Sequence, residues 1–141
     1  MEIVKTLNVP AAFIYNKIID SVLFDIKKHT GDSLNKKQLA NYEYIKQFSS
    51  NSRAKIKIEK HIENQSYHFR TSTTRNEFVV KYDIKPIDDM HCEVTYYEDM
   101  TSHGFMQKMN DMVIGSMIGF LKKRQFKKML EMMESSYYTS K

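Results

Sequence analysis

The side chains best suited to chemistry are tyrosines that recur at alternate positions along strand-like segments. On the inner face of a sheet such a hydroxyl needs a partner, and it can hold the carbonyl or hydroxyl group of a ligand. The alternative is that each tyrosine lies near a sheet end with its hydroxyl in water. Lys60 and Glu98 share this face but lie near predicted strand ends, where they should reach solvent. The polar candidates for this face are Tyr42, Tyr44, Tyr67, Tyr82, Tyr96, Lys46, Lys60 and Glu98.

The histidines and the single cysteine match no catalytic or metal-binding motif. His61 and His68 flank one predicted turn on the solvent side, and because no third ligand is evident we expect surface histidines rather than a metal site. His91 and Cys92 are adjacent, so they point to opposite faces of a strand and do not form a nucleophile and its base. Cys92 is expected to be a small buried hydrophobic residue. We predict no catalytic residues, no metal and no cofactor.

The net charge of +5 comes from one short segment. The chain has 22 Lys and Arg against 17 Asp and Glu, and residues 122–128 hold five positive charges and no negative one. Such a run can attract anionic lipid or nucleic acid, but it more often forms a solvated helix end, here with Glu131 and Glu134 nearby. Because nucleic-acid readers spread basic and aromatic residues over one face, we predict no nucleic-acid partner.

Length and composition favour one globular domain over residues 1–141. Hydrophobic residues make up 41% and charged residues 28%, which argues against disorder. The longest apolar stretch, Met112 to Leu121, is about half the length that a bilayer requires. One cysteine suits a reducing compartment, and no secretory signal is visible, so we expect a cytoplasmic protein with no membrane span.

The first third of the chain predicts a strand followed by helices. Residues 2–9 are rich in β-branched residues, and Pro10 suits the first turn of a helix. Two short helices are expected, one ending near Asp20 and the next capped by Asp20 or Ser21 and ended by Gly31. Residues 32–40 are polar and fit either a short strand or a loop over a cavity mouth.

Five alternating segments between residues 42 and 97 predict an antiparallel meander. The apolar pattern also predicts registers, because a slip of one residue would turn the apolar side chains to solvent. A turn at residues 63–64 pairs Ile58 with Phe69 and Glu59 with His68. A turn at residues 74–75 pairs Thr71 with Phe78 and Phe69 with Val80.

From about residue 103 the pattern predicts a helix of about 30 residues with a frayed tail from about 135. Eight of the ten methionines lie between Met100 and Met133, and they either fill an irregular core or line a cavity. Two apolar stripes lie about half a turn apart on this helix. One stripe holds Met106, Met109, Val113, Met117 and Phe120, and the other holds Met112, Gly115, Gly119, Phe126, Leu130 and Met133.

The order of elements resembles the START-like superfamily, also called helix-grip, pollen-allergen-like or polyketide-cyclase-like. Residues 7–15, Leu-Asn-Val-Pro-Ala-Ala-Phe-Ile-Tyr, continuing to Ile18-Ile19-Asp20, are similar to its first strand, Val-Pro and helix. Within it the chain looks most similar to a small bacterial group of uncharacterised proteins. The resemblance implies an α+β fold: a curved antiparallel sheet of six or seven strands wrapped around a long C-terminal helix, with two short helices after the first strand. The resemblance assigns no catalytic residues to this chain.

Three functions follow from this fold. The favoured one is a non-enzymatic binding protein for a small apolar or aromatic molecule, with a cavity between sheet and C-terminal helix. The second is an interaction module, such as a homodimer formed through the doubly apolar helix, without ligand. The third is a cyclase- or hydrolase-type enzyme, which needs a buried acid–base pair and finds only Glu98 and the tyrosines. The predicted ligand-binding residues are Tyr44, Ile56, Ile58, Tyr67, Phe69, Phe78, Val80, Tyr82, Tyr96, Met109, Val113, Met117 and Phe120.

Overall fold

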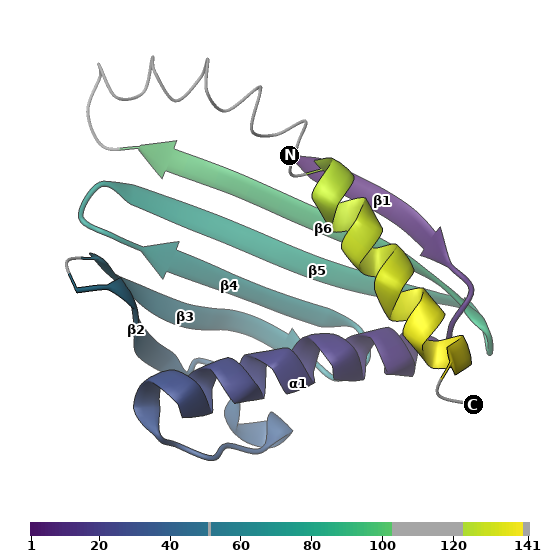
Figure 1. The fold of residues 1–141 in the computed structure, drawn as a ribbon, viewed down its shortest axis with the longest axis horizontal. Helices are drawn as coiled ribbons and strands as arrows, with labels where there is room; N and C mark the ends of the chain where they lie inside the picture. Colours follow the sequence, from purple (N-terminus) through teal and green to yellow (C-terminus); the bar gives the residue numbers. More distant parts are fainter. Residues whose placement is uncertain (51, 103–122, 140–141) are drawn as a thin grey trace.

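The computed structural model describes residues 1–50, 52–102 and 123–139 (Figure 1). The elements are β1 (Glu2–Leu7), α1 (Ala11–Thr30), the short 3₁₀ helix η1 (Lys36–Gln38), β2 (Glu43–Ser49), β3 (Ser52–Ile62), β4 (Ser66–Ser72), β5 (Asn76–Asp88), β6 (His91–Ser102) and a C-terminal helix over residues 123–139. The described strands form a six-stranded antiparallel sheet in the order β1-β6-β5-β4-β3-β2. The predicted α+β class and the antiparallel meander are confirmed, with the lower of the two expected strand numbers.

Helix α1 is a single helix of 20 residues, where two short helices were predicted. The prediction placed a boundary at Asp20 and Ser21, but both residues lie inside the helix. The apolar stripe of Ile14, Ile18 and Ile26 runs through this point without a break, so packing on the sheet favours a continuous helix. The helix ends where predicted: Gly31 adopts a left-handed conformation (φ 80°), and its N–H donates to the Lys27 carbonyl.

The ambiguous segment 32–40 forms no strand. It contains η1, which is stabilised by a capping box between Asn35 and Gln38. Leu39, directly after η1, is fully buried in the main core. Leu39 and the partly buried Leu34 therefore hold this polar connection against the body of the protein.

The predicted registers are confirmed except at one point. Ile58 pairs with Phe69, Phe69 with Val80, and Thr71 with Phe78. The prediction that Glu59 pairs with His68 is wrong. A bulge between Ile58 and Lys60 makes Lys60 the partner of His68 instead. A bulge adds one residue to one strand and so reverses the facing of the residues that follow.

Helix α1 and the C-terminal helix lie over the same face of the sheet, which we call the inner face (Figure 1). Helix α1 lies nearer the β2 edge, and the C-terminal helix lies nearer β1 and β6. Leu130 of the C-terminal helix is fully buried in the same cluster as Ile19, Ile58 and Val94. The described members of the second predicted stripe, Phe126, Leu130 and Met133, all belong to this core. The first stripe lies outside the described residues.

The C-terminal helix runs to residue 139, although a frayed tail was expected from about 135. Its last turns are anchored: Tyr137 contacts Phe13 edge-to-face at 4.8 Å, and the Tyr138 hydroxyl donates to the Asn8 carbonyl. Glu134 accepts a hydrogen bond from the Asn8 N–H at 2.8 Å. The described cations of the basic segment, at positions 123, 124, 127 and 128, are exposed.

Candidate functional site

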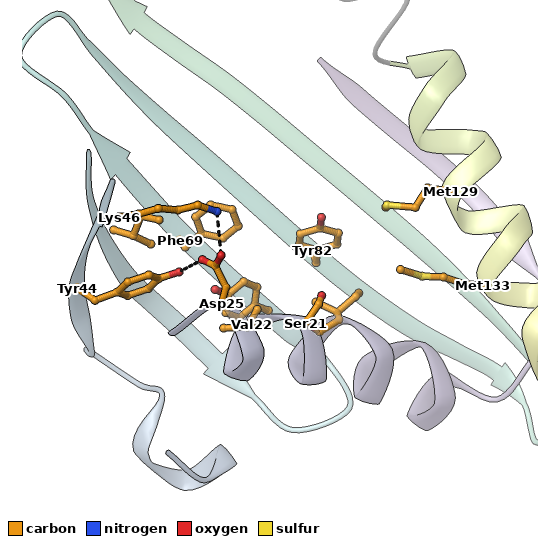
Figure 2. Close-up of a pocket in the computed structure, with 12 residues that line it drawn as sticks. Ser21, Val22, Asp25, Tyr44, Lys46, Phe69, Tyr82, Met129 and Met133 are labelled. Carbon is orange, nitrogen blue, oxygen red and sulfur yellow. Dashed lines mark hydrogen bonds and ion pairs between the residues drawn. The ribbon is translucent and has the colours of Figure 1, made fainter. Parts of the chain in front are cut away.

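A pocket of about 400 Å³ lies among the inner face, α1 and the C-terminal helix. Strands β2 to β5 supply aromatic and aliphatic side chains, α1 supplies a polar and apolar edge, and the C-terminal helix supplies two methionines (Figure 2). The lining residues are Ile18, Ser21, Val22, Asp25, Tyr44, Lys46, Ile56, Tyr67, Phe69, Tyr82, Met129 and Met133.

The polar end of the pocket is a cluster of three side chains, Asp25, Tyr44 and Lys46 (Figure 2). The Tyr44 hydroxyl donates to Asp25 Oδ2 at 2.7 Å, and Lys46 Nζ lies 3.0 Å from Asp25 Oδ1. His29, one turn further along α1, lies 3.5 Å from the same Oδ1. In Figure 2 the two methionines lie at the other end of the pocket, with Tyr82 between. The pocket thus has one polar and one apolar end.

The Asp25 carboxylate stays ionised at neutral pH. Partial burial acts to raise its pKa, but the hydrogen bonds from Tyr44 and Lys46 and the nearby charges of Lys46 and His29 outweigh burial and hold the pKa below its usual range. Burial and the Asp25 charge raise the pKa of Tyr44 well above its ordinary value. The cluster is therefore a carboxylate–ammonium pair with a neutral phenol hydrogen-bonded to it.

Two further pocket tyrosines face each other across β4 and β5. Tyr67 and Tyr82 are register partners, and their ring centroids lie 6.3 Å apart. Burial is the main cause that raises both pKa values, that of Tyr82 to about 12. Both phenols are therefore protonated at neutral pH, and each can donate a hydrogen bond.

The remaining inner-face candidates lie outside the pocket lining. Tyr42 donates to Asp32 at the protein surface, so its hydroxyl reaches solvent as the alternative prediction held. Tyr96 is buried and donates to Glu98 Oε2 at 2.7 Å. Glu98 was expected at a strand end, but β6 continues to Ser102 and Glu98 is half-buried. Lys60 reaches solvent because the bulge turns it to the outer face.

His61 lies on the inner face, whereas a solvent-facing position was predicted. The bulge in β3 places Glu59 and Lys60 outward and turns His61 inward, where its ring stacks on Tyr15 of α1. The Tyr15 hydroxyl lies 2.6 Å from His61 Nε2, and Tyr15 is almost completely buried. Burial lowers the pKa of His61, and the positive charge of Lys36 adds to this effect against the opposing charge of Glu63.

Acidification should therefore destabilise the protein through His61. Its pKa is lower in the folded chain than in the unfolded one, so between these values the unfolded chain binds more protons and stability falls as the pH falls below about 6.5. We expect the His61 ring to titrate below that value by NMR. When the pH is lowered from 7.5 to 5.5, the free energy of unfolding measured in urea should fall less for His61→Gln than for the wild type. A His61 midpoint above 6.5 would contradict the buried position.

The other histidines and the cysteine have local roles. His68 lies on the outer face, 2.9 Å from Asp83 Oδ1, and His91 lies 2.7 Å from Asp88 Oδ1. Cys92 is fully buried, as predicted, and burial raises its pKa to about 11. Among the described residues, no three His, Cys, Asp or Glu side chains gather in a group that could hold a metal ion.

The predicted ligand-binding residues fall into three sets. Tyr44, Ile56, Tyr67, Phe69 and Tyr82 line the pocket. The second set lies outside the pocket lining and consists of Ile58, Phe78, Val80 and Tyr96. Ile58, Val80 and Tyr96 are buried in the core, and Phe78 is half-buried near the start of β5. Met109, Val113, Met117 and Phe120 lie outside the described residues, so their part in a cavity stays a prediction.

Sequence reasoning missed the contribution of α1 to the pocket. Ser21, Val22 and Asp25 lie three, four and seven positions after Ile18, which is the spacing of one helical face. This spacing was available as a signal, but the expected boundary at Asp20 hid it. Met129 and Met133 were also missed as lining residues, although Met133 belonged to a predicted apolar stripe.

No helix in the described part of the chain is both long enough and apolar enough to cross a membrane.

Comparison with solved structures identifies the fold. The Ara h 8.0201 structure matches with a TM-score of 0.50 and 14% identity, covering 100% of this chain and 97% of that one. Norcoclaurine synthase from Thalictrum flavum, in complex with dopamine and hydroxybenzaldehyde, matches with a TM-score of 0.57 and 8% identity, covering 100% and 87%. DynU16, a putative protein of the dynemicin biosynthetic locus, matches with a TM-score of 0.62 and 11% identity, covering 100% of this chain and 48% of that one.

These similarities confirm the predicted START-like, helix-grip fold. A comparison with curated proteins found no match. Residues 1–119 match the family model described as Domain of unknown function (DUF3284). The chain is therefore a member of the DUF3284 family and has the helix-grip fold.

Proposed function

We propose that the protein binds a small apolar or aromatic molecule in the pocket between α1, the inner face and the C-terminal helix. The observation that carries this proposal is a pocket of about 400 Å³ with a mostly apolar lining and a few polar groups at defined positions. Small-molecule sites in proteins typically have volumes of about 300–1,000 Å³ and the same division between apolar walls and a few orienting polar groups.

The charges at the site favour an uncharged ligand. Among the described lining residues, Asp25 is the acidic one and Lys46 the basic one, and they are paired with each other at 3.0 Å. A charged ligand would have to compete with this pair or enter without a counter-ion, which burial penalises. The aromatic rings of Phe69, Tyr67 and Tyr82 suit a flat apolar body.

A route to the surface adjoins the pocket. A second hollow of about 450 Å³ shares Met129 and Met133 with it and is otherwise lined by Lys17, Gln125, Lys128, Met132 and Ser136. The two shared side chains are unbranched and flexible, so they can adapt to ligands of different shape. Exchange of the ligand between α1 and the C-terminal helix follows from this arrangement.

The structural relatives support a small aromatic ligand only by analogy of fold. Norcoclaurine synthase was solved with dopamine and hydroxybenzaldehyde, both small aromatic molecules. Binding is preferred to catalysis because the pocket groups titrate away from neutrality: the pKa of Asp25 is lowered and that of Tyr82 is raised to about 12. An acid–base catalyst works best with a pKa near the working pH.

The test is binding of N-phenyl-1-naphthylamine, an uncharged aromatic dye whose fluorescence rises in an apolar site. Ser21 lines the pocket and its side chain is partly open to solvent, so Ser21→Trp should fill the pocket and weaken binding at least about tenfold, which corresponds to ~1.4 kcal/mol. The matched control is Asp20→Trp, because Asp20 is the neighbouring exposed residue of α1 and does not line the pocket.

Equal dye affinity in Ser21→Trp and Asp20→Trp would show that the dye binds outside the pocket. Absence of dye binding to the wild type would contradict the proposal. Native mass spectrometry of the purified protein reports oligomeric state and bound small molecules together. A ligand-free dimer that binds no dye would favour the interaction module instead.

A further inference from the structure

Tyr67 and Tyr82 differ from the other tyrosines between the sheet and α1 because their hydroxyls have no hydrogen-bond partner within the described part of the chain. The hydroxyls of Tyr15, Tyr42, Tyr44 and Tyr96 each have one: they lie beside His61, Asp32, Asp25 and Glu98 respectively. Tyr67 is nevertheless only 4% exposed, and Tyr82 is covered by Tyr96 and Phe126 on one side.

A buried phenol without a partner costs about 1–3 kcal/mol, so proteins seldom leave one in this state. No completely enclosed side-chain oxygen or nitrogen among the described residues lacks a partner. The two hydroxyls are therefore not sealed into packed protein. Both residues line the pocket, which is the open space beside them.

The two hydroxyls come from directly paired positions on adjacent strands, with ring centroids 6.3 Å apart. Two neighbouring donors match one acceptor that has two lone pairs, as a carbonyl oxygen does. A neutral carbonyl is also much cheaper to bury beside Ile56 and Phe69 than a carboxylate.

We propose that Tyr67 and Tyr82 together donate hydrogen bonds to a carbonyl oxygen of the ligand, so that the preferred ligands are uncharged aromatic ketones, aldehydes or related carbonyl compounds. This inference rests on the proposed function and names the ligand class for that same pocket. Both tyrosines act here as binding residues, and Asp25 with Lys46 forms the wall at the polar end.

The experiment compares 2-acetylnaphthalene with 2-ethylnaphthalene, which has nearly the same shape but no carbonyl. Affinities are measured by displacement of the naphthylamine dye from the wild type, Tyr67→Phe, Tyr82→Phe and the double variant. Each lost hydroxyl should weaken the ketone about three- to tenfold, and 2-ethylnaphthalene should change less than about twofold. Tyr42→Phe is the matched control, because Tyr42 does not line the pocket.

Infrared spectra of ketone labelled with ¹³C at the carbonyl give a second readout that a change in pocket shape would not mimic. In the wild-type complex the C=O stretch should lie below its value in hexane, and in the double variant it should return towards that value. An unshifted stretch in the wild type, or equal weakening of both naphthalenes by the Phe variants, would overturn the inference while leaving the proposed function standing. Failure of both naphthalenes to bind the wild type would instead count against the proposed function.

Discussion

Replacement of Leu130 by alanine is expected to lower the free energy of unfolding by about 2–5 kcal/mol. Leu130 lies on the C-terminal helix and is a fully buried member of the main core. Its removal leaves a cavity between helix and sheet that neighbours fill only in part. Because alanine favours helices more than leucine does, the loss would measure tertiary packing rather than helix propensity.

Met132→Ala is the matched control, since Met132 lies two positions away on the same helix and is 73% exposed. It should change stability by no more than about 0.5 kcal/mol. Urea unfolding followed by circular dichroism measures both. A loss below about 1 kcal/mol for Leu130→Ala would contradict the packing of this helix against the inner face.

The second large effect is expected at Asp25. Asp25→Ala removes the acceptor of the Tyr44 hydroxyl and the counter-ion of Lys46, and should cost about 1.5–3 kcal/mol of stability at pH 7. Lys46→Met should be destabilising as well, because Asp25 then loses its ion pair with Lys46. The double variant should lose less than the sum of the two single variants, since the charges of Asp25 and Lys46 are then removed together.

The cost of Asp25→Ala should also depend on pH. The pKa of Asp25 is lower in the folded protein, so the stability that this group contributes is present above its unfolded value of about 3.9 and is lost as the pH falls through the folded value. Other carboxylates with lowered pKa values, such as Asp83, are present in both proteins and cancel. The difference between wild type and variant should therefore shrink near pH 3. A difference that stays constant from pH 7 to pH 3 would show that folding does not lower the pKa of Asp25.

Local sequence patterns were sufficient to predict most of the fold. Alternation along β4 and β5 was enough to predict that Phe69 pairs with Val80 and Thr71 with Phe78, because one face of these strands must be apolar. The left-handed Gly31 at the end of α1 was equally readable, since few other residues tolerate that conformation. These features depend only on neighbours in sequence or on a simple two-residue period.

The errors have a common physical cause, which is that tertiary packing overrides local signals. Asp20 and Ser21 are residue types that favour helix N-caps. The apolar residues before and after them nevertheless pack against the same sheet, and this packing keeps α1 continuous. The bulge in β3 does not interrupt the alternation of apolar and polar residues before Lys60. It nevertheless turns the His61 side chain from the outer to the inner face of the sheet. A single inserted position therefore changed a surface histidine into a partner of Tyr15.

The site shows the same division. The strand period in the sequence determined an aromatic face of the sheet, towards which Tyr44, Tyr67 and Tyr82 could point. The family resemblance carried by the element order implied the helix-grip arrangement. Only the tertiary structure decided which polar groups meet in the pocket. Asp25 and Lys46 lie on α1 and β2, and nothing in their local patterns pairs them; the packing of the helix across the sheet brings them to 3.0 Å. The same packing places Tyr67 and Tyr82 in the pocket lining, and within the described part of the chain it brings no acceptor to their hydroxyls.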